Sequence, residues 1–226
     1  MTPTLAQRLV AEALGAAFLL ATVVGSGIMA QKLAGGSLAL ALLGNTIPTG
    51  AILAVLIVIF GPISGAHMNP VVSLAMALRG QLSVGSLWTY VVAQLLGAVI
   101  GVLAAHAMFD LPLLQISSTA RTCAPQWFAE CVATFGLLLT VLGCVARAPL
   151  ATPYAVGLYI TAAYWFTAST SFANPAVTVA RALSDTFAGI APSSVPAFIA
   201  AQIVGMLAAV AIAPWLWPPQ VDELVA

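Results

Sequence analysis

Six long apolar segments, separated by short polar or glycine-rich connections, dominate the pattern of hydrophobic and polar positions along this chain. A helix needs roughly 20 apolar residues to cross about 30 Å of hydrocarbon. The segments that meet this length lie at about 7–30, 38–60, 86–108, 127–146, 153–171 and 195–217. We therefore predict an all-α membrane protein with six transmembrane helices.

Two further apolar intervals, Gly61–Gly80 and Phe172–Ser194, are too apolar for aqueous loops, yet the helices they contain are too short to span a membrane. Each interval contains an Asn-Pro pair. Asn favours the cap of a helix, and Pro favours its first turn because the missing N–H donor costs nothing there. We predict two re-entrant half-helices, from Asn69-Pro70 to about Arg79 and from Asn174-Pro175 to about Leu183.

The chain is also an internal repeat, because three blocks recur in the same order. The pairs are AEALGAAFLLATVVG (11–25) with AECVATFGLLLTVLG (129–143), NPVVSLAMAL (69–78) with NPAVTVARAL (174–183), and AQLLG (93–97) with AQIVG (201–205). The repeats cover about 7–108 and 127–217, with three spans each, so the second half enters from the opposite side of the membrane. This predicts an inverted 3+3 repeat within a single transmembrane channel domain, residues 1–226.

The inverted repeat brings the N-terminal ends of both half-helices to the middle of the membrane. Each Asn oxygen caps its own helix, which leaves the amide of Asn69 and of Asn174 free to donate into the centre. Both helix dipoles direct their positive ends at this point and oppose cations. The preceding backbone, Gly65-Ala66-His67 and Ser171-Phe172-Ala173, is expected to line a cavity with its carbonyl groups. One isolated Asn-Pro favours simple capping, whereas two copies in register favour a functional centre.

Composition agrees with a lipid environment: 62% of the residues are hydrophobic and 5% are charged. The net charge of zero opposes a nucleic-acid partner, and we expect none. Cys123, Cys131 and Cys144 have no metal-ligand spacing, and two of them lie inside apolar runs, where cysteine packs as a small apolar residue, so we expect no metal and no cofactor. Basic residues give no orientation, because Arg8, Arg79 and Arg147 on one side balance Lys32, Arg121 and Arg181 on the other.

With these motifs the chain resembles the aquaporin, or major intrinsic protein, family. SGAHMNPVVS is similar to the family's first Asn-Pro-Ala box, with Val71 in place of alanine, and SFANPAVTVA contains the second box intact. The resemblance implies six helices plus two half-helices around one pore per subunit and a homotetramer in the lipid bilayer. It implies passive permeation of water or small neutral solutes across the cell membrane, and we expect both termini of this multi-pass protein in the cytoplasm.

Several single residues match family positions. Glu12 and Glu130 match buried glutamates of the first and fourth helices, and we expect them to accept hydrogen bonds from the backbone of the pore loops. His67 also matches, either as part of the inner vestibule or as a brace for its loop. Gly97 and Gly205 match positions where small residues let helices approach closely.

The family narrows at four selectivity positions, which by spacing fall here on Thr49, Ala162, Ser171 and Val177; a slip of one residue would put Phe172 in place of Ser171. Most members carry an arginine where this chain has Val177. Its absence predicts a wider, less polar filter that admits bulkier neutral solutes. Arg181 is one turn further on and is expected nearer the end of the half-helix. A valine with small neighbours is similar to bacterial aquaglyceroporins linked with arsenic resistance, which implies arsenite, methylated arsenicals, glycerol-like solutes and water.

Other classes of function remain open. A water-selective or general glycerol channel is the nearest alternative. Inverted repeats also build ion-coupled secondary transporters, but those need ionisable groups near the midplane, where only Glu12, Glu130 and His67 are candidates. A membrane enzyme is disfavoured because no nucleophile and base can be paired. A structural junction protein would conduct nothing.

Overall fold

The computed structural model describes residues 2–218, and within this range it is helical throughout, with no strand. The elements in chain order are α1 (Leu5–Leu33), α2 (Leu38–Ser64), α3 (Pro70–Leu78), α4 (Val84–Met108), α5 (Ala124–Arg147), the 3₁₀ turn η1 (Pro149–Ala151), α6 (Thr152–Phe166), α7 (Pro175–Arg181), the 3₁₀ turn η2 (Pro192–Ser194) and α8 (Val195–Leu216). The predicted all-α fold with two re-entrant half-helices is confirmed.

Five of the predicted spans are helices long and apolar enough to cross a membrane: α1, α2, α4, α5 and α8 together with its preceding turn. The sixth differs from the prediction for 153–171, because α6 has 15 residues and ends at Phe166. The residues that follow, 167–173, leave the helix and turn toward the centre of the molecule. The prediction treated this apolar segment as helix because its hydrophobicity alone does not distinguish helix from buried irregular backbone.

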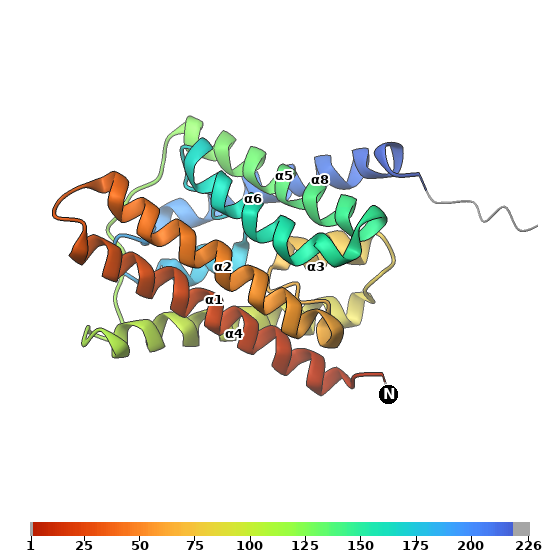
Figure 1. Ribbon diagram of the computed structural model, residues 1–226, viewed down its shortest axis with the longest axis horizontal. Helices are drawn as coiled ribbons and strands as arrows, with labels where there is room; N and C mark the ends of the chain where they lie inside the picture. The colour runs from red at the N-terminus through yellow and green to blue at the C-terminus, as the bar shows by residue number, and fades with distance from the viewer. Residues whose placement is uncertain (1, 219–226) are drawn as a thin grey trace, which may run out of the picture.

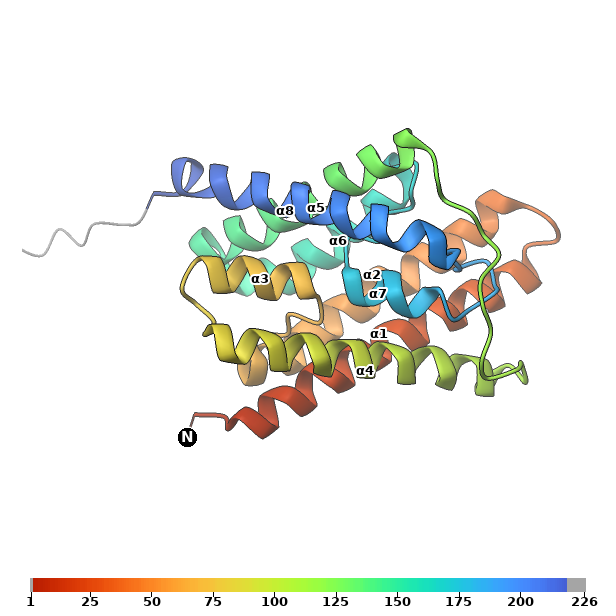
Figure 2. The same cartoon turned by 180° about the vertical axis from the view of Figure 1, so that it is seen from behind.

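The long helices lie side by side along the longest axis of the molecule (Figure 1). The two half-helices α3 and α7 lie end to end between α4 and α8 (Figure 2). Both begin at the middle and run outward, α3 toward the end that holds the N-terminus and α7 toward the opposite end. They meet at their N-terminal ends, as the inverted repeat predicts.

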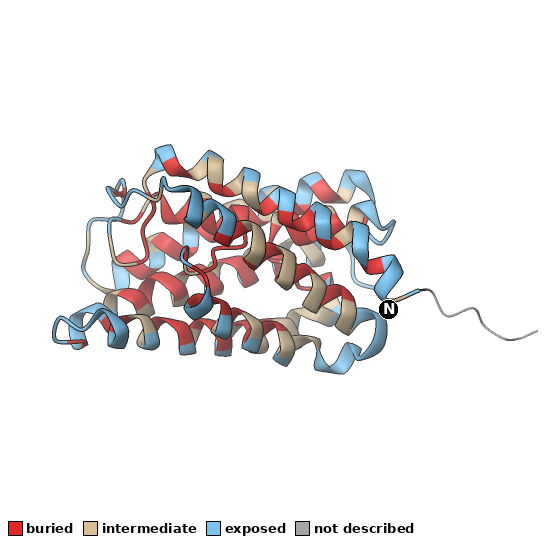
Figure 3. Ribbon diagram, turned by 90° about the horizontal axis from the view of Figure 1, so that it is seen from above, coloured by how far each residue is buried: buried red, intermediate tan, exposed pale blue. Residues whose placement is uncertain are grey.

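The burial pattern is that of a protein surrounded by lipid. Buried residues face the inside of the bundle, whereas the outward faces of the long helices are exposed (Figure 3). Those exposed faces are nevertheless apolar: Phe18 is 56% exposed, Val92 55% and Leu158 70%. Large apolar side chains on every outer helix are compatible with a hydrocarbon solvent, and not with water alone.

Two pairs of long helices approach closely, α1 with α4 and α5 with α8. At each crossing a glycine lies against the backbone of the partner helix: Gly97 against Ala13, and Gly205 against Cys131. A Cβ atom at Gly97 would overlap the carbonyl oxygen of Ala13 and lie 2.8 Å from its carbonyl carbon. The matching glycines of the two AQxxG blocks thus permit the same packing in both halves.

Replacing Gly97 by alanine should lower Tm, although alanine is the better helix former by about 1 kcal/mol. Backbone cannot give way as a flexible side chain does, so we expect overpacking to cost about 1–3 kcal/mol. The measurement is thermal unfolding of the purified protein in detergent. Gly61→Ala is the matched control, because Gly61 lies in α2 with open space where a Cβ would be. Equal Tm values for both variants would contradict the close-packing role.

Candidate functional site

The two Asn-Pro pairs begin the half-helices in the same way. Asn69 and Asn174 are N-cap residues with φ of −158° in both cases, and Pro70 and Pro175 occupy the first helical position. Asn69 Oδ1 accepts from the N–H of Val71 at 3.1 Å, and Asn174 Oδ1 accepts from the N–H of Ala176 at 2.9 Å. The side-chain oxygens are therefore used for capping, and each amide nitrogen faces away from its own helix.

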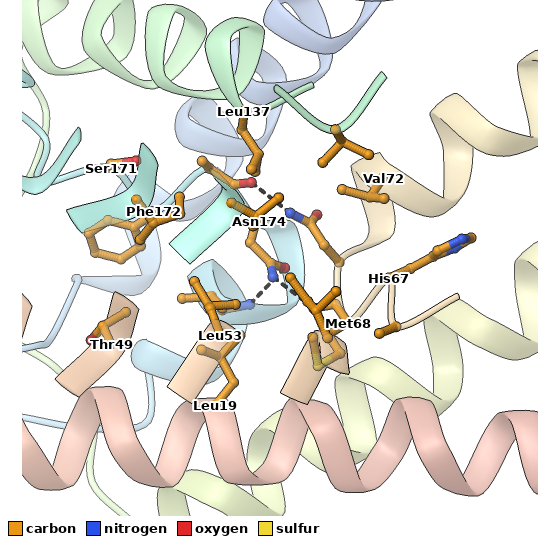
Figure 4. Close-up of a pocket in the computed structure, with 18 of the residues that line it drawn as sticks. Leu19, Thr49, Leu53, His67, Met68, Val72, Leu137, Ser171, Phe172 and Asn174 are labelled. Carbon is orange, nitrogen blue, oxygen red and sulfur yellow. Dashed lines mark hydrogen bonds between the residues drawn. The ribbon is translucent and has the colours of Figure 1, made fainter. Parts of the chain in front are cut away.

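These amides are not wholly free, which corrects the expectation from sequence. Asn69 Nδ2 donates to the carbonyl of Ala173, and Asn174 Nδ2 donates to the carbonyl of Met68, both at 2.8 Å (Figure 4). Each half-helix is thus tied to the loop that precedes the other. A side-chain amide has two N–H donors, so one donor on each Asn is left for a molecule at the centre.

The loops before the half-helices hold a backbone conformation that few residues adopt. Positive φ angles occur at Ala66 (48°) and Met68 (47°) in the first loop, and at Ser171 (52°) and Ala173 (46°) in the second. For residues other than glycine such conformations cost about 1 kcal/mol or more each. They persist only where the surroundings fix them, so the loops need strong partners for their N–H groups.

Two buried carboxylates supply those partners. Glu12 accepts from the N–H groups of His67 (2.9 Å) and Met68 (2.6 Å), and Glu130 accepts from those of Phe172 (2.8 Å) and Ala173 (2.9 Å). Both glutamates are fully buried. The hydrogen bonds expected of these acids are present, and they hold the strained loops in place.

Two glutamines complete this network and are absent from the residues predicted for the site. Gln94 Nε2 donates to Glu12 at 2.7 Å and to Ser73 at 2.9 Å. Gln202 Nε2 donates to Glu130 at 2.6 Å and to the Thr178 hydroxyl at 2.9 Å. The signal for them is present in the sequence, because each glutamine belongs to one of the repeated AQLLG and AQIVG blocks.

One central cavity of about 310 Å³ follows the line of the half-helices. It reaches from Gln81 and Thr152, near the end of the molecule that holds the N-terminus, to Tyr164 and Arg181, near the other end. Residues at corresponding positions of the repeats line it in pairs: Asn69 with Asn174, Val72 with Val177, Met76 with Arg181, Leu19 with Leu137, Val23 with Val141, and His67 with Phe172. Gly65, Ala66 and Ala173 also line it.

Three of the four predicted selectivity positions lie at this cavity: Thr49, Ser171 and Val177. Ala162 does not, because it is exposed on the outer face of α6, and this prediction is wrong. The inward face of α6 carries Val156, Ile160 and Tyr164, which are four residues apart and so share one side of a helix. Tyr164 takes the place expected for Ala162, and its hydroxyl lies 3.5 Å from that of Thr49.

Ser171 and Phe172, the two alternatives for one filter position, both line the cavity. Figure 4 shows Asn174 between His67 on one side and Phe172 with Thr49 on the other. The Ser171 hydroxyl is buried and has no hydrogen-bond partner in the described part of the chain. The oxygen atom itself is covered by the surrounding atoms, so it is an unsatisfied polar group in the cavity wall.

His67 combines the two roles that its position leaves open. Its ring lines the cavity, Nδ1 lies 3.0 Å from the Ser73 hydroxyl, and the ring centroid is 5.4 Å from that of Tyr90. Arg8 donates to the Tyr90 hydroxyl at 2.7 Å, so this end of the cavity is braced from α1.

Arg181 also departs from expectation. It lies at the end of α7 as predicted, but its side chain turns to the cavity instead of leaving it. The guanidinium carbon lies 3.5 Å from the centroid of the Phe172 ring, Nε donates to the carbonyl of Ala188, and the residue is 2% exposed. The spacing from Asn174 does not predict this orientation, because spacing locates the Cα of Arg181 and not the guanidinium at the end of its long side chain.

The loop between α4 and α5, residues 109–123, covers this end of the molecule. Ser117 N–H donates to the carbonyl of Ala182, and Ser118 donates to Asp185 from both its N–H (2.8 Å) and its hydroxyl (2.9 Å). The bonds from Ser118 lower the pKa of the exposed Asp185 carboxyl. Arg121 donates to the carbonyls of Gly189 and Ser169, and burial lowers the pKa of its guanidinium.

Comparison with known proteins identifies relatives of this chain. A family model described as major intrinsic protein matches residues 1–152. Aquaglyceroporin AqpS of Rhizobium meliloti (strain 1021) is 54% identical over 215 residues, 95% of this chain and 92% of that protein. The probable aquaporin AqpM of Archaeoglobus fulgidus is 30% identical over 246 residues, 96% of this chain and 98% of that protein. The solved structure of the aquaglyceroporin from Plasmodium falciparum has the same fold, with a TM-score of 0.70, 21% identity, and coverage of 92% of this chain and 95% of that one.

Proposed function

Because this chain belongs to the major intrinsic protein family, we propose that it conducts small uncharged solutes passively through the central cavity. The observation that carries the proposal is the pair Asn69 and Asn174, each with one N–H left for a solute where the two half-helices meet. Acceptors and donors then replace the hydrogen bonds that a neutral solute leaves behind in water.

A channel fits the cavity better than an ion-coupled transporter does. Coupling needs a group that gains and loses charge along the pathway. Within residues 2–218 no carboxylate lines the cavity. Glu12 and Glu130 are engaged by loop N–H groups and a glutamine, which leaves them a structural task.

The filter favours solutes larger than water. Val177 is short and apolar, and Thr49 and Tyr164 place hydroxyl groups around the same part of the cavity. A neutral polyhydroxy molecule can exchange bonds with these hydroxyls as it passes. Glycerol-like solutes, arsenite as the neutral triol As(OH)₃, and methylated arsenicals belong to this class, and the 54% identical relative is named an aquaglyceroporin. We further propose a homotetramer in the cell membrane with both termini in the cytoplasm.

Stopped-flow measurements on proteoliposomes test this function with water, glycerol and arsenite. All three should equilibrate faster than in protein-free liposomes, with rates that rise linearly with the gradient. Saturable flux that follows a proton or sodium gradient would favour a secondary transporter. No flux of any solute would favour a structural protein.

A further inference from the structure

The cavity contains one permanently charged side chain within the described residues, Arg181. We infer that the charge of Arg181 excludes cations from this pore. Arg181 lies one helical turn beyond Val177 on α7. The inference rests on the proposed channel function and assigns different roles in it to Val177 and Arg181. Val177 sets the width of the filter, and Arg181 sets its charge.

Burying the charge of Arg181 costs folding free energy, which points to a functional reason for its position. The residue is 2% exposed, and a buried charge without a carboxylate partner is strongly disfavoured. Among residues 2–218 it forms no ion pair, and its guanidinium is balanced by the Ala188 carbonyl and the face of the Phe172 ring. A cation over an aromatic face is stabilised when little water intervenes. An ionisable residue at membrane depth is a functional candidate for this reason.

The free donors of Arg181 face the cavity. Its only hydrogen bond to the described part of the chain is made by Nε, so the terminal amino groups are unengaged while the residue lines the cavity. Ser171, whose hydroxyl is buried and unpartnered, lies in the wall of the same cavity. The guanidinium of Arg181 thus forms a polar layer of the cavity that donates to the oxygen atoms of a neutral solute and repels a cation.

Nearby charges leave this layer positive. Arg121 lies behind it, with its guanidinium carbon 5.0 Å from the centroid of the same Phe172 ring. Glu130 is the nearest buried acid, but it does not line the cavity, and its oxygens accept from Phe172, Ala173 and Gln202. The two arginines therefore outnumber the one acid, and in a confined passage such a field acts strongly on ions.

The repeat supplies a comparison within the molecule. At the position of Arg181, the first half has Met76, which also lines the cavity. The two ends of the pore thus differ by one charge, so a side-chain barrier to cations is expected at the Arg181 end and not at the Met76 end, in addition to the field of the two helix dipoles at the centre. Arg79, the basic residue at the end of α3, is exposed and does not line the cavity.

The test measures methylammonium and potassium entry into proteoliposomes that contain the full chain, with water flux recorded on the same vesicles. Arg181→Met makes this end like the Met76 end, and Arg181→Gln keeps hydrogen-bond donors without the charge. Both should raise cation entry about tenfold or more. Arg181→Lys should keep most of the exclusion, and Arg79→Met should behave as the parent protein.

Measurable water flux with unchanged cation exclusion in the two neutral variants would overturn the inference. So would loss of folding in both, because Arg181 would then be a structural clamp between Phe172 and Ala188. Absence of water and glycerol flux in the parent protein is a different result, and it would refute the proposed function instead.

Discussion

Replacing Val177 by arginine is expected to reduce glycerol flux about tenfold or more, while water flux falls by much less. Val177 lines the cavity from α7, so a longer side chain at this position extends into the pathway. Arg181 already lies one turn away on the same helix, and the like charge drives the new guanidinium away from it and toward the opposite wall. The passage is then narrowed where Thr49 and Tyr164 lie.

Stopped-flow flux of water and glycerol through the same proteoliposomes measures this effect. Val177→Leu is the control for bulk without charge, and it should reduce glycerol flux only slightly. Equal losses of water and glycerol in Val177→Arg, or no loss of either, would show that Val177 does not set the size limit.

Glu130→Gln is expected to destabilise the protein by about 2–4 kcal/mol, because a buried charge-assisted network loses acceptors. One carboxylate oxygen accepts from Phe172 N–H at 2.8 Å, and the other accepts from Ala173 N–H at 2.9 Å and Gln202 Nε2 at 2.6 Å. A glutamine has one acceptor oxygen, so its amino group must face at least one of these donors. Without that support, the strained backbone at Ser171 and Ala173 should relax and close the pore.

Thermal unfolding in detergent and water flux in liposomes report the two consequences. Asp185→Asn is the matched control, because Asp185 also accepts a backbone N–H but is exposed in a loop. Its Tm should change little. A Glu130→Gln variant with parental Tm and water flux would mean that the carboxylate is dispensable for the loop.

Much of this fold is predictable from sequence because its determinants are local. The length of an apolar run fixes a span, and Asn174-Pro175 specifies a helix start whatever surrounds it. The end of α6 at Phe166 is not local in this sense. It depends on Glu130, which captures the backbone at Phe172 and Ala173 and draws the chain away from a helix.

The site was predictable to a smaller extent for a related reason. Counting residues from Asn174 locates Val177 correctly because both lie on one short helix. Ala162 was misplaced because its helix is separated from Asn174 by irregular backbone, and a small error of register there turns a side chain to the opposite face. The place of Arg181 at the cavity is not predicted, because spacing describes where a Cα lies and not how far its side chain extends.

The reciprocal bonds of the two asparagines bear on how the molecule assembles and how it could be divided. Cut between its halves, either piece would keep an amide donor without its distant carbonyl and a carbonyl without its distant donor. Neither piece could satisfy these hydrogen bonds alone, although each contains one half-helix and a complete loop held by a carboxylate. Each half of the membrane domain therefore completes the hydrogen bonds of the other. A half on its own could form them only with a second copy in the opposite orientation in the membrane.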